Sequence, residues 1–261
     1  MKAFIRFFLK KFFLLKLNTK FIRKLEQIFS LYQGKGWGSD SIEKEIESCL
    51  SLLNNKPKIF IDIGANKGLY TKTIISKIPN IKCHLFEPSA YNVDVLKKVF
   101  VKHKTVKINN FALSKINAQS NLYSNFTGSG YASLTKRRLD HFNEEMNIVD
   151  PIVVKRFDNY WKEKELIIDY VKADVEGHEL DVLKGFGELI FNSRLIQFEF
   201  GGCNIDTKTY FQDFWYFFLD KDFIIYRITP RGPELISQYD EKDEYFVTTN
   251  YIALNKKYLG K

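Results

Sequence analysis

The segment Ile59–Thr71 reads IFIDIGANKGLYT and contains two glycines, Gly64 and Gly68. The apolar run at 58–63 has the length of a buried strand, and the residues at 70–78 have helical spacing. Gly64 would allow the turn between them and let a ligand approach the backbone closely. This strand, glycine turn and helix predict the first unit of a doubly wound α/β sheet.

Strand and helix patterns alternate along the rest of the chain. Further strands are predicted at 81–86, 106–110, 168–174, 194–199, 223–228 and 245–254. Further helices are predicted at 41–53, 92–100, 179–184 and 207–219, with Gly185 as the C-cap of the third. Repeated strand–helix units indicate a parallel sheet with helices on both faces, forming a single domain at 31–256.

Acidic residues stand at the expected strand ends. In open α/β sheets, ligands bind beyond the carboxyl ends of the strands, near the point where the strand order reverses. The residues expected to converge there are Asp62, Gly64, Glu87, Asp174, Glu176 and Glu199.

The spacing of Gly64 and Gly68 differs from the G-x-G-x-x-G turn of nicotinamide dehydrogenases. Asp62 would repel a pyrophosphate, but it suits the cationic amino-acid end of S-adenosylmethionine. Glu87 ends the second strand, where a carboxylate can accept bonds from both hydroxyls of a ribose. Gly68 would let the following helix pack close to the strand. An ordinary strand-to-helix turn is the alternative.

Six motifs resemble, in order and spacing, those of the FkbM-type methyltransferases: DIGANKGLYT, FEPS, FALS, VVKRFDNY, VKADVEGHELDVLKG and FEF. That family consists of S-adenosylmethionine-dependent class I enzymes. The resemblance implies a class I, Rossmann-like sheet of seven strands with the last one antiparallel, so that 245–254 would insert beside 223–228. It also implies O-methylation, commonly of sugars or polyketide-like metabolites.

The resemblance also implies the cofactor contacts. Asp62, Gly64, Asn66 and Gly68 would line the methionine end of S-adenosylmethionine, and Glu87 would bind the ribose. The other predicted cofactor-binding residues are Ala112 and Leu113 at the adenine, together with Ala65, Tyr70, Pro88 and Asp174.

The stretch Val171–Gly185, VKADVEGHELDVLKG, concentrates ionisable residues where a strand passes into a helix. Residues two apart on a strand share a face, so Lys172 and Asp174 are expected to form an ion pair, directly or through Glu199. Glu179 falls in the first helical turn, where a carboxylate is favourable beside the helix dipole. Capping is therefore its expected role.

Methyl transfer to a hydroxyl requires positioning of the acceptor oxygen and removal of its proton. Asp174 is the first candidate for general base or acceptor binding, because its strand faces the transferring methyl group in this fold. Glu176 is the second. His178 is the third, because its ordinary pKa suits a base, although a surface or capping role is the alternative. Lys172 and Glu199 complete the predicted catalytic set.

Metal binding is the less favoured interpretation of the same residues. Asp174, Glu176 and Glu199 carry oxygen ligands of the kind that Mg²⁺ prefers, but no spacing requires a metal. The three cysteines have no Cys-x-x-Cys or Cys/His spacing, which argues against structural zinc and against a disulfide framework. Their pattern is typical of a reducing cytosol.

The net charge of +9 is concentrated at the amino terminus. Residues 1–26 hold eight Lys or Arg and one Glu, so the rest of the chain carries only +2, which argues against nucleic-acid binding by the body. Residues 1–30 predict a basic amphipathic helix. Contact of residues 1–25 with an anionic membrane is one interpretation, and packing on the domain or in an oligomer is the other. The predicted location is the cytoplasm, with peripheral attachment to the inner face of the membrane as an option.

Residues 114–150 predict a long irregular insertion before the strand at 168–174. It contains FTGSGYASLTKRR, whose glycines would allow movement and whose basic run at 136–138 supplies positive charge. A lid over an acidic or phosphorylated sugar and a solvated charge cluster are both open.

The leading hypothesis is an S-adenosylmethionine-dependent O-methyltransferase that acts on a sugar hydroxyl in a surface glycan or its precursor. O-methylation of a small secondary metabolite or of a lipid is the alternative within the same class of enzyme. A third hypothesis is a non-catalytic module that binds the cofactor and interacts with a partner protein.

Overall fold

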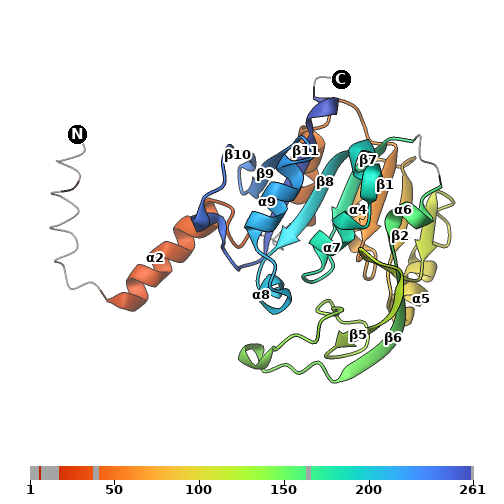
Figure 1. Cartoon of the computed structure of the whole chain (residues 1–261), viewed down its shortest axis with the longest axis horizontal. Helices are drawn as coiled ribbons and strands as arrows, with labels where there is room; N and C mark the ends of the chain where they lie inside the picture. Colours follow the sequence, from red (N-terminus) through yellow and green to blue (C-terminus); the bar gives the residue numbers. More distant parts are fainter. Residues whose placement is uncertain (1–5, 7–17, 38–40, 163–165, 260–261) are drawn as a thin grey trace.

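A computed structural model of the chain describes residues 6, 18–37, 41–162 and 166–259. Eight strands form its main sheet, in the order β10-β9-β11-β8-β7-β1-β2-β3 (Figure 1). They are β1 (Ile59–Ile63), β2 (Lys82–Phe86), β3 (Val106–Asn109), β7 (Ile168–Ala173), β8 (Ser193–Phe200), β9 (Phe223–Thr229), β10 (Gly232–Ile236) and β11 (Thr249–Asn255).

The sheet has eight strands rather than the predicted seven. Strands β8, β7, β1, β2 and β3 run parallel, and β11 runs antiparallel between β8 and β9, as predicted. The additional strand, β10, pairs with β9 at the edge. Its sequence GPELI opens with glycine and proline and has only two aliphatic residues, so no strand pattern indicated it. Proline is tolerated in edge strands, where its missing N–H does not break the ladder.

Each face of the sheet has its own helices, because side chains alternate between the faces. Phe60 and Tyr170 belong to the core shared with α3, α4 and α5, whereas Ile61 and Val171 belong to the core shared with α6, α7 and α9. This three-layer arrangement confirms the predicted α/β fold class. The helices are α3 (Ile42–Ser51), α4 (Leu69–Lys77), α5 (Ala90–Val99), α6 (Phe157–Tyr160), α7 (Glu179–Lys184), α8 (Cys203–Thr207) and α9 (Phe211–Leu219), with short 3-10 turns η1 (Asp140–Phe142), η2 (Gly187–Asn192), η3 (Glu241–Asp243) and η4 (Lys256–Tyr258).

The predicted bounds of three elements agree with the structure to different degrees. Helix α7 has the predicted bounds, and Gly185 is its C-cap. The helix predicted at 207–219 begins only at Phe211, as α9, because Lys208 has a left-handed backbone with φ of 55° and ends the preceding helix α8. Strand β11 begins at Thr249 rather than at 245, because the residues before it follow the turn η3.

A second sheet lies below the main sheet in Figure 1 and has the order β4-β6-β5. Its strands are β4 (Ala112–Leu113), β5 (Ala118–Ser124) and β6 (Ile148–Lys155). The prediction of an irregular insertion at 114–150 is therefore wrong for β5 and for the start of β6. The sequence AQSNLYS gives a weak signal because Leu122 is its one residue in the buried core of this sheet.

Helix α2 (Thr19–Tyr32) projects from the body of the protein (Figure 1). Asn18 precedes it with an extended backbone, and the Asn18 Oδ1 accepts a bond from the amide of Lys20 at 2.8 Å. This N-cap starts a new helix, so the prediction of one continuous helix over 1–30 is wrong at this residue.

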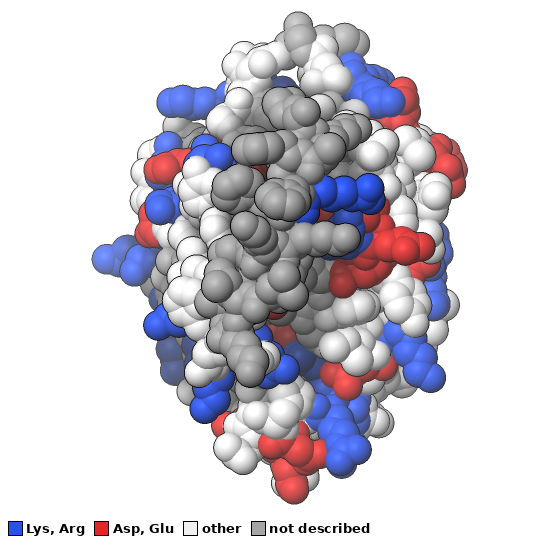
Figure 2. Space-filling view, turned by 90° about the vertical axis from the view of Figure 1, so that its left-hand side faces the viewer, with Lys and Arg blue, Asp and Glu red and all other residues white. Residues whose placement is uncertain are grey.

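Only part of the basic amino-terminal segment lies within the described residues. Residues 1–5 and 7–17, which include most of the segment predicted to contact a membrane, lie outside the described residues. Figure 2 shows Lys and Arg interspersed with Asp and Glu on the coloured part of one face. Within residues 6, 18–37, 41–162 and 166–259, no helix is long and apolar enough to cross a bilayer.

Candidate functional site

A pocket of about 620 Å³ lies at the carboxyl ends of β1, β2, β7 and β8. Small-molecule sites typically have about 300–1,000 Å³. The second sheet and the loop at 129–134 border its other side. The predicted site residues that line it are Gly64, Ala65, Asn66, Tyr70, Glu87, Pro88, Ala112, Leu113, Lys172, Asp174, Glu176, His178 and Glu199.

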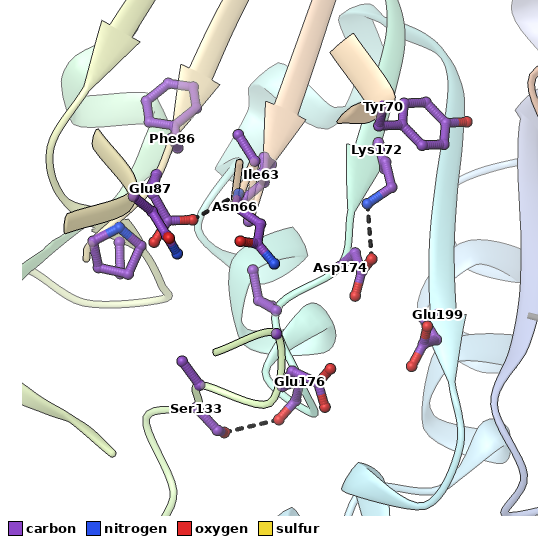
Figure 3. Close-up of a pocket in the computed structure, with 18 of the residues that line it drawn as sticks. Ile63, Asn66, Tyr70, Phe86, Glu87, Ser133, Lys172, Asp174, Glu176 and Glu199 are labelled. Carbon is purple, nitrogen blue, oxygen red and sulfur yellow. Dashed lines mark hydrogen bonds and ion pairs between the residues drawn. The ribbon is translucent and has the colours of Figure 1, made fainter. Parts of the chain in front are cut away.

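The Glu87 carboxylate lies at the end of β2, on one side of the pocket (Figure 3). Its Oε1 accepts a bond from the Ser89 amide at 2.9 Å, and its Oε2 accepts one from the Asn66 amide at 2.8 Å. Burial raises the pKa of Glu87 to about 7, although these bonds oppose the rise. The two amides and the side chain of Asn92 fix the carboxylate, which has about four lone-pair sites and can therefore still accept a bond from a ligand hydroxyl.

Gly64 lines the pocket, as predicted, and it is also required by a close approach of β7. Its backbone is left-handed, with φ of 80°, and a Cβ there would lie 1.9 Å from the carbonyl oxygen of Asp174. The Asp174 amide also donates to the carbonyl oxygen of Ile63 at 3.0 Å. The glycine thus lets the ends of β1 and β7 meet at the pocket.

Asp62 and Gly68 do not line the pocket, although both were predicted cofactor contacts. Asp62 is fully buried, and its Oδ2 accepts a bond from Thr71 Oγ1 at 2.5 Å. Gly68 has a left-handed φ of 81°, and a Cβ there would lie 2.6 Å from the ring of Phe100. It therefore allows α4 to pack against α5, rather than against the strand as predicted.

Lys172 Nζ donates to Asp174 Oδ2 at 2.8 Å, which confirms the predicted ion pair in its direct form (Figure 3). The same Nζ lies 4.9 Å from the centre of the Tyr70 ring. Burial lowers the pKa of Lys172, but the surrounding carboxylates, Asp174 first, raise it by more, so the net shift is upward. Lys172 therefore remains charged, and Asp174 retains Oδ1 for a ligand.

Glu176 lies in the turn after β7 and has a left-handed φ of 54°, which is uncommon for a residue other than glycine. Arg137 Nη1 pairs with its carboxylate, and Ser133 Oγ donates to its carbonyl oxygen at 2.8 Å. Burial and the charge of Asp174 raise the pKa of Glu176 to about 8, despite Arg137. The insertion is thus attached directly to the turn that carries Glu176.

The basic run at 136–138 is only partly exposed, because Lys136 and Arg138 are exposed but Arg137 is buried. Arg137 is buried and pairs with Asp206 at 3.3 Å as well as with the turn after β7. Arg138 pairs with Asp140 at 2.6 Å. None of the three basic residues lines the pocket, so they give the lid interpretation no direct support for an acidic sugar.

His178 lines the pocket, which excludes a purely surface role for this residue. Its Nε2 lies 2.9 Å from Thr135 Oγ1 of the insertion. Burial lowers the pKa of His178, so the imidazole is uncharged at neutral pH. His178 therefore adds no positive charge to the pocket.

Glu199 stands on β8, next to the strand that carries Asp174 (Figure 3). Burial and the charges of Asp174 and Glu176 raise the pKa of Glu199 well above its ordinary value. A carboxyl group that keeps its proton near neutrality can donate a hydrogen bond. In the described part of the chain, no group of three His, Cys, Asp or Glu is arranged to hold a metal ion, so the magnesium interpretation gains no support.

Glu45 of α3 also lines the pocket, and sequence reasoning missed it. It is 5% exposed, its Oε2 accepts a bond from Gln197 Nε2 at 2.7 Å, and burial raises the pKa of Glu45 to about 7. A signal existed: Glu45 occupies a core-facing position of the helix together with Ile42, Ile46 and Cys49. An acid in such a stripe needs a partner.

The Methyltransferase FkbM domain matches residues 62–225, which is more than half of the chain. The chain belongs to the FkbM methyltransferase family. This membership confirms the resemblance seen in the motifs, and the methyl donor of such methyltransferases is S-adenosylmethionine, as predicted. Helix α3 and strand β11 lie outside the matched range.

Solved structures with similar folds include other methyltransferases. The FkbM methyltransferase of Methylobacillus flagellatus KT is 14% identical with a TM-score of 0.48, and the match covers 89% of this chain but only 60% of that one. The plantazolicin methyltransferase BpumL, in complex with SAH, is 8% identical with a TM-score of 0.46, covering 90% of each chain. No curated protein matches the sequence. The family assignment therefore rests on the domain match.

The pocket of this FkbM-family protein fits S-adenosylmethionine by the chemistry of its walls. Phe86, Ala112 and Leu113 supply an apolar wall of the kind that adenine needs, and Glu87 supplies the acceptor for the ribose. The Oδ1 atoms of Asn66 and Asn92 are buried without a hydrogen-bond partner in the described chain. Both residues line the pocket, so a bound ligand with N–H or O–H groups would satisfy them.

The Glu87→Gln variant is expected to bind S-adenosylhomocysteine about 10- to 100-fold more weakly than the wild type. The side-chain NH2 group of glutamine would face one of the two backbone amides that now donate to Glu87, so that two donors would meet. The variant would also lose one acceptor for the ribose. Isothermal titration calorimetry measures the change. The exposed Glu188→Gln variant is the control, and equal affinity of both variants would contradict the assignment.

Glu179 lies in the first turn of α7, as predicted, and its hydrogen bonds extend to the turn before the helix. It is fully buried, and its Oε1 accepts bonds from the amides of Val175 at 2.8 Å and Gly177 at 3.1 Å, which precede the helix. Its Oε2 is buried without a partner in the described chain. Glu179 therefore holds the turn that contains Glu176, and burial raises the pKa of Glu179 to about 7.

The Glu179→Gln variant is expected to gain stability relative to the wild type as the pH rises. The pKa of Glu179 is about 7 in the folded protein and 4.5 ordinarily, so folding takes up a proton between these values. Its contribution to stability therefore falls through that range of pH and is constant above it. Glutamine keeps the acceptor for both amides and does not titrate. Melting temperatures from pH 5 to 8 test this, and a difference independent of pH would contradict it.

Proposed function

We propose that this FkbM-family protein is an S-adenosylmethionine-dependent O-methyltransferase. The Lys172–Asp174 pair is the observation that carries the proposal, because it presents a carboxylate oxygen in the same pocket as Glu87. Strands β2 and β7 flank β1 on opposite sides. Glu87, which would bind the ribose, and Asp174, which would act on the acceptor, thus lie on opposite sides of the glycine turn that follows β1.

The residues of the pocket have separate tasks in this proposal. When bound, S-adenosylmethionine supplies an electrophilic methyl group. Asp174 Oδ1 would take the proton of the acceptor hydroxyl, while Lys172 holds Oδ2 and fixes the carboxylate. Glu176, whose carboxylate is held by Arg137, would accept a bond from another hydroxyl of the acceptor.

We propose a sugar hydroxyl, in a surface glycan or its precursor, as the acceptor. A ligand with several hydroxyls suits the further polar groups that line the pocket, which include Ser129, Ser133, Glu176, His178, Glu199 and Thr248. A small metabolite or a lipid hydroxyl is the alternative acceptor. A non-catalytic module is the remaining alternative, and the intact Lys172–Asp174 pair argues against it.

Methyl transfer to a panel of acceptors tests the proposal. The protein would be incubated with S-adenosylmethionine carrying a labelled methyl group and with free sugars, nucleotide sugars, lipid-linked sugars or small phenols. Label is expected in a sugar, in an ether bond that resists alkaline hydrolysis. Transfer to phenols or lipids alone would select the alternative acceptor, and S-adenosylmethionine binding without transfer to any acceptor would favour the non-catalytic module.

We also propose that the amino-terminal region binds the surface of an anionic membrane. Phe21, Ile28, Phe29 and Tyr32 share one side of α2 and are 52%, 52%, 60% and 55% exposed. The net charge of +7 within residues 1–26 is complementary to anionic lipid headgroups. An exposed apolar stripe combined with this charge is typical of helices that lie in the membrane interface.

Sedimentation with lipid vesicles tests the membrane proposal. The full chain is expected to sediment with vesicles that contain phosphatidylglycerol and to remain in solution with phosphatidylcholine alone. The double variant Phe21→Glu, Phe29→Glu is expected to lose sedimentation, whereas Val101→Glu, which is exposed on the body, is the matched control. A double variant that still sediments, or one that only changes from dimer to monomer, would contradict membrane binding.

A further inference from the structure

The amino-acid end of S-adenosylmethionine carries an ammonium and a carboxylate, and each needs a partner of opposite charge. Asp62 was the predicted partner of the ammonium, but it is fully buried, bonded to Thr71 and absent from the pocket wall. Its Oδ1 has no partner among the described residues, but a carboxylate in the pocket wall is better placed to meet the ammonium.

Polar residues in register on β1, β7 and β8 form a row across the sheet that ends beside a carboxylate of α3. Asp62 of β1 is in register with Lys172 of β7, which is in register with Gln197 of β8. Gln197 Nε2 donates to Glu45 Oε2 at 2.7 Å and to Asn250 Oδ1 at 3.2 Å. The row thus fixes a carboxylate of α3 at the edge of the pocket where Lys172 lies.

Glu45 and Lys172 together offer one group of each charge. No hydrogen bond to Glu45 Oε1 occurs within the described ranges of the chain, although the residue is only 5% exposed. Because Glu45 lines the pocket, its Oε1 is available to a cationic group of a ligand. Lys172 Nζ has three donors, of which one goes to Asp174.

We propose that Glu45 binds the α-ammonium group of S-adenosylmethionine and that Lys172 binds its carboxylate. This inference rests on the proposed cofactor. Helix α3 lies outside the matched domain at 62–225, so a segment that precedes the family domain would complete the cofactor site. Tyr70 also lines the pocket, with its ring centre 4.9 Å from Lys172 Nζ, and would pack against the methylene chain of the methionyl group.

Calorimetry with two ligands tests the assignment without an acceptor. S-adenosylhomocysteine has the amino-acid end, and 5′-methylthioadenosine lacks it. The Glu45→Gln variant is expected to bind S-adenosylhomocysteine about 10- to 100-fold more weakly than the wild type, the range for hydrogen bonds to charged groups. Its affinity for 5′-methylthioadenosine is expected to equal that of the wild type. Glu43→Gln, exposed on the same helix, is the matched control and should change neither affinity.

The outcomes separate this inference from the proposed function. Equal weakening of both ligands by Glu45→Gln, or no weakening of either, would overturn the role of Glu45 while leaving S-adenosylhomocysteine binding intact. A wild type that binds neither ligand would overturn the proposed function and this inference together. Glu45→Asp, which keeps the charge on a shorter side chain, is expected to recover part of the affinity for S-adenosylhomocysteine, and its melting temperature checks that the fold is retained.

Discussion

The Asp174→Asn variant is expected to transfer methyl groups with a kcat about 100- to 10,000-fold below that of the wild type. The amide still accepts the bond from Lys172 Nζ, which is 2.8 Å from Asp174 Oδ2, so the side chain should keep its place. It cannot take a proton from the acceptor. Initial rates of S-adenosylhomocysteine release, measured with the acceptor found in the panel, give the effect.

Two measurements separate a lost base from a damaged pocket. The affinity of Asp174→Asn for S-adenosylhomocysteine is expected to stay close to that of the wild type. Asp181→Asn is the matched control. Asp181 lies on α7, pairs with Lys115 at 3.1 Å and does not line the pocket. Similar kcat values for the two variants would remove Asp174 from the role of general base.

The Gly64→Ala variant is expected to lose about 2 to 6 kcal/mol of the free energy of unfolding, from left-handed backbone strain and overpacking. The Cβ would meet the Asp174 carbonyl oxygen at 1.9 Å, where the ends of β1 and β7 are in contact. Because Asp174 would have to move, the variant is also expected to lose methyl transfer. Urea denaturation followed by circular dichroism measures the loss of stability.

Gly232→Ala is the control for backbone strain alone. Gly232 has a positive φ of 110°, but a Cβ there would meet no atom within 4 Å. The excess loss in Gly64→Ala over Gly232→Ala therefore reports the contact between β1 and β7. Equal losses in the two variants would show that this contact does not constrain the fold.

The sequence predicted the central strands well, because these strands are buried on both faces. All five residues of β1 and all six of β7 are buried, and most of them are apolar, as is typical of parallel strands covered on both faces. Parallel strands place their carboxyl ends at one edge, so the convergence of Glu87, Asp174 and Glu199 followed from the strand pattern. The polar strands β5 and β10 had no such pattern and were missed.

The sequence could not predict which way the polar side chains of the site point. Asp62 and Gly64 stand two residues apart on either side of Ile63, yet only Gly64 lines the pocket. That outcome depends on Thr71 of the next helix and on the approach of β7, which are three-dimensional facts. Glu45 was harder still, because its partner Gln197 is 152 residues away along the chain.

Titration of the full chain with S-adenosylhomocysteine in a calorimeter tests the cofactor site most directly, because the measurement needs no acceptor. The pocket between Glu87 and Lys172 predicts saturable binding of one ligand per chain, weakened by Glu87→Gln and unchanged by Glu188→Gln. An absence of binding at millimolar ligand would contradict the proposed methyltransferase function.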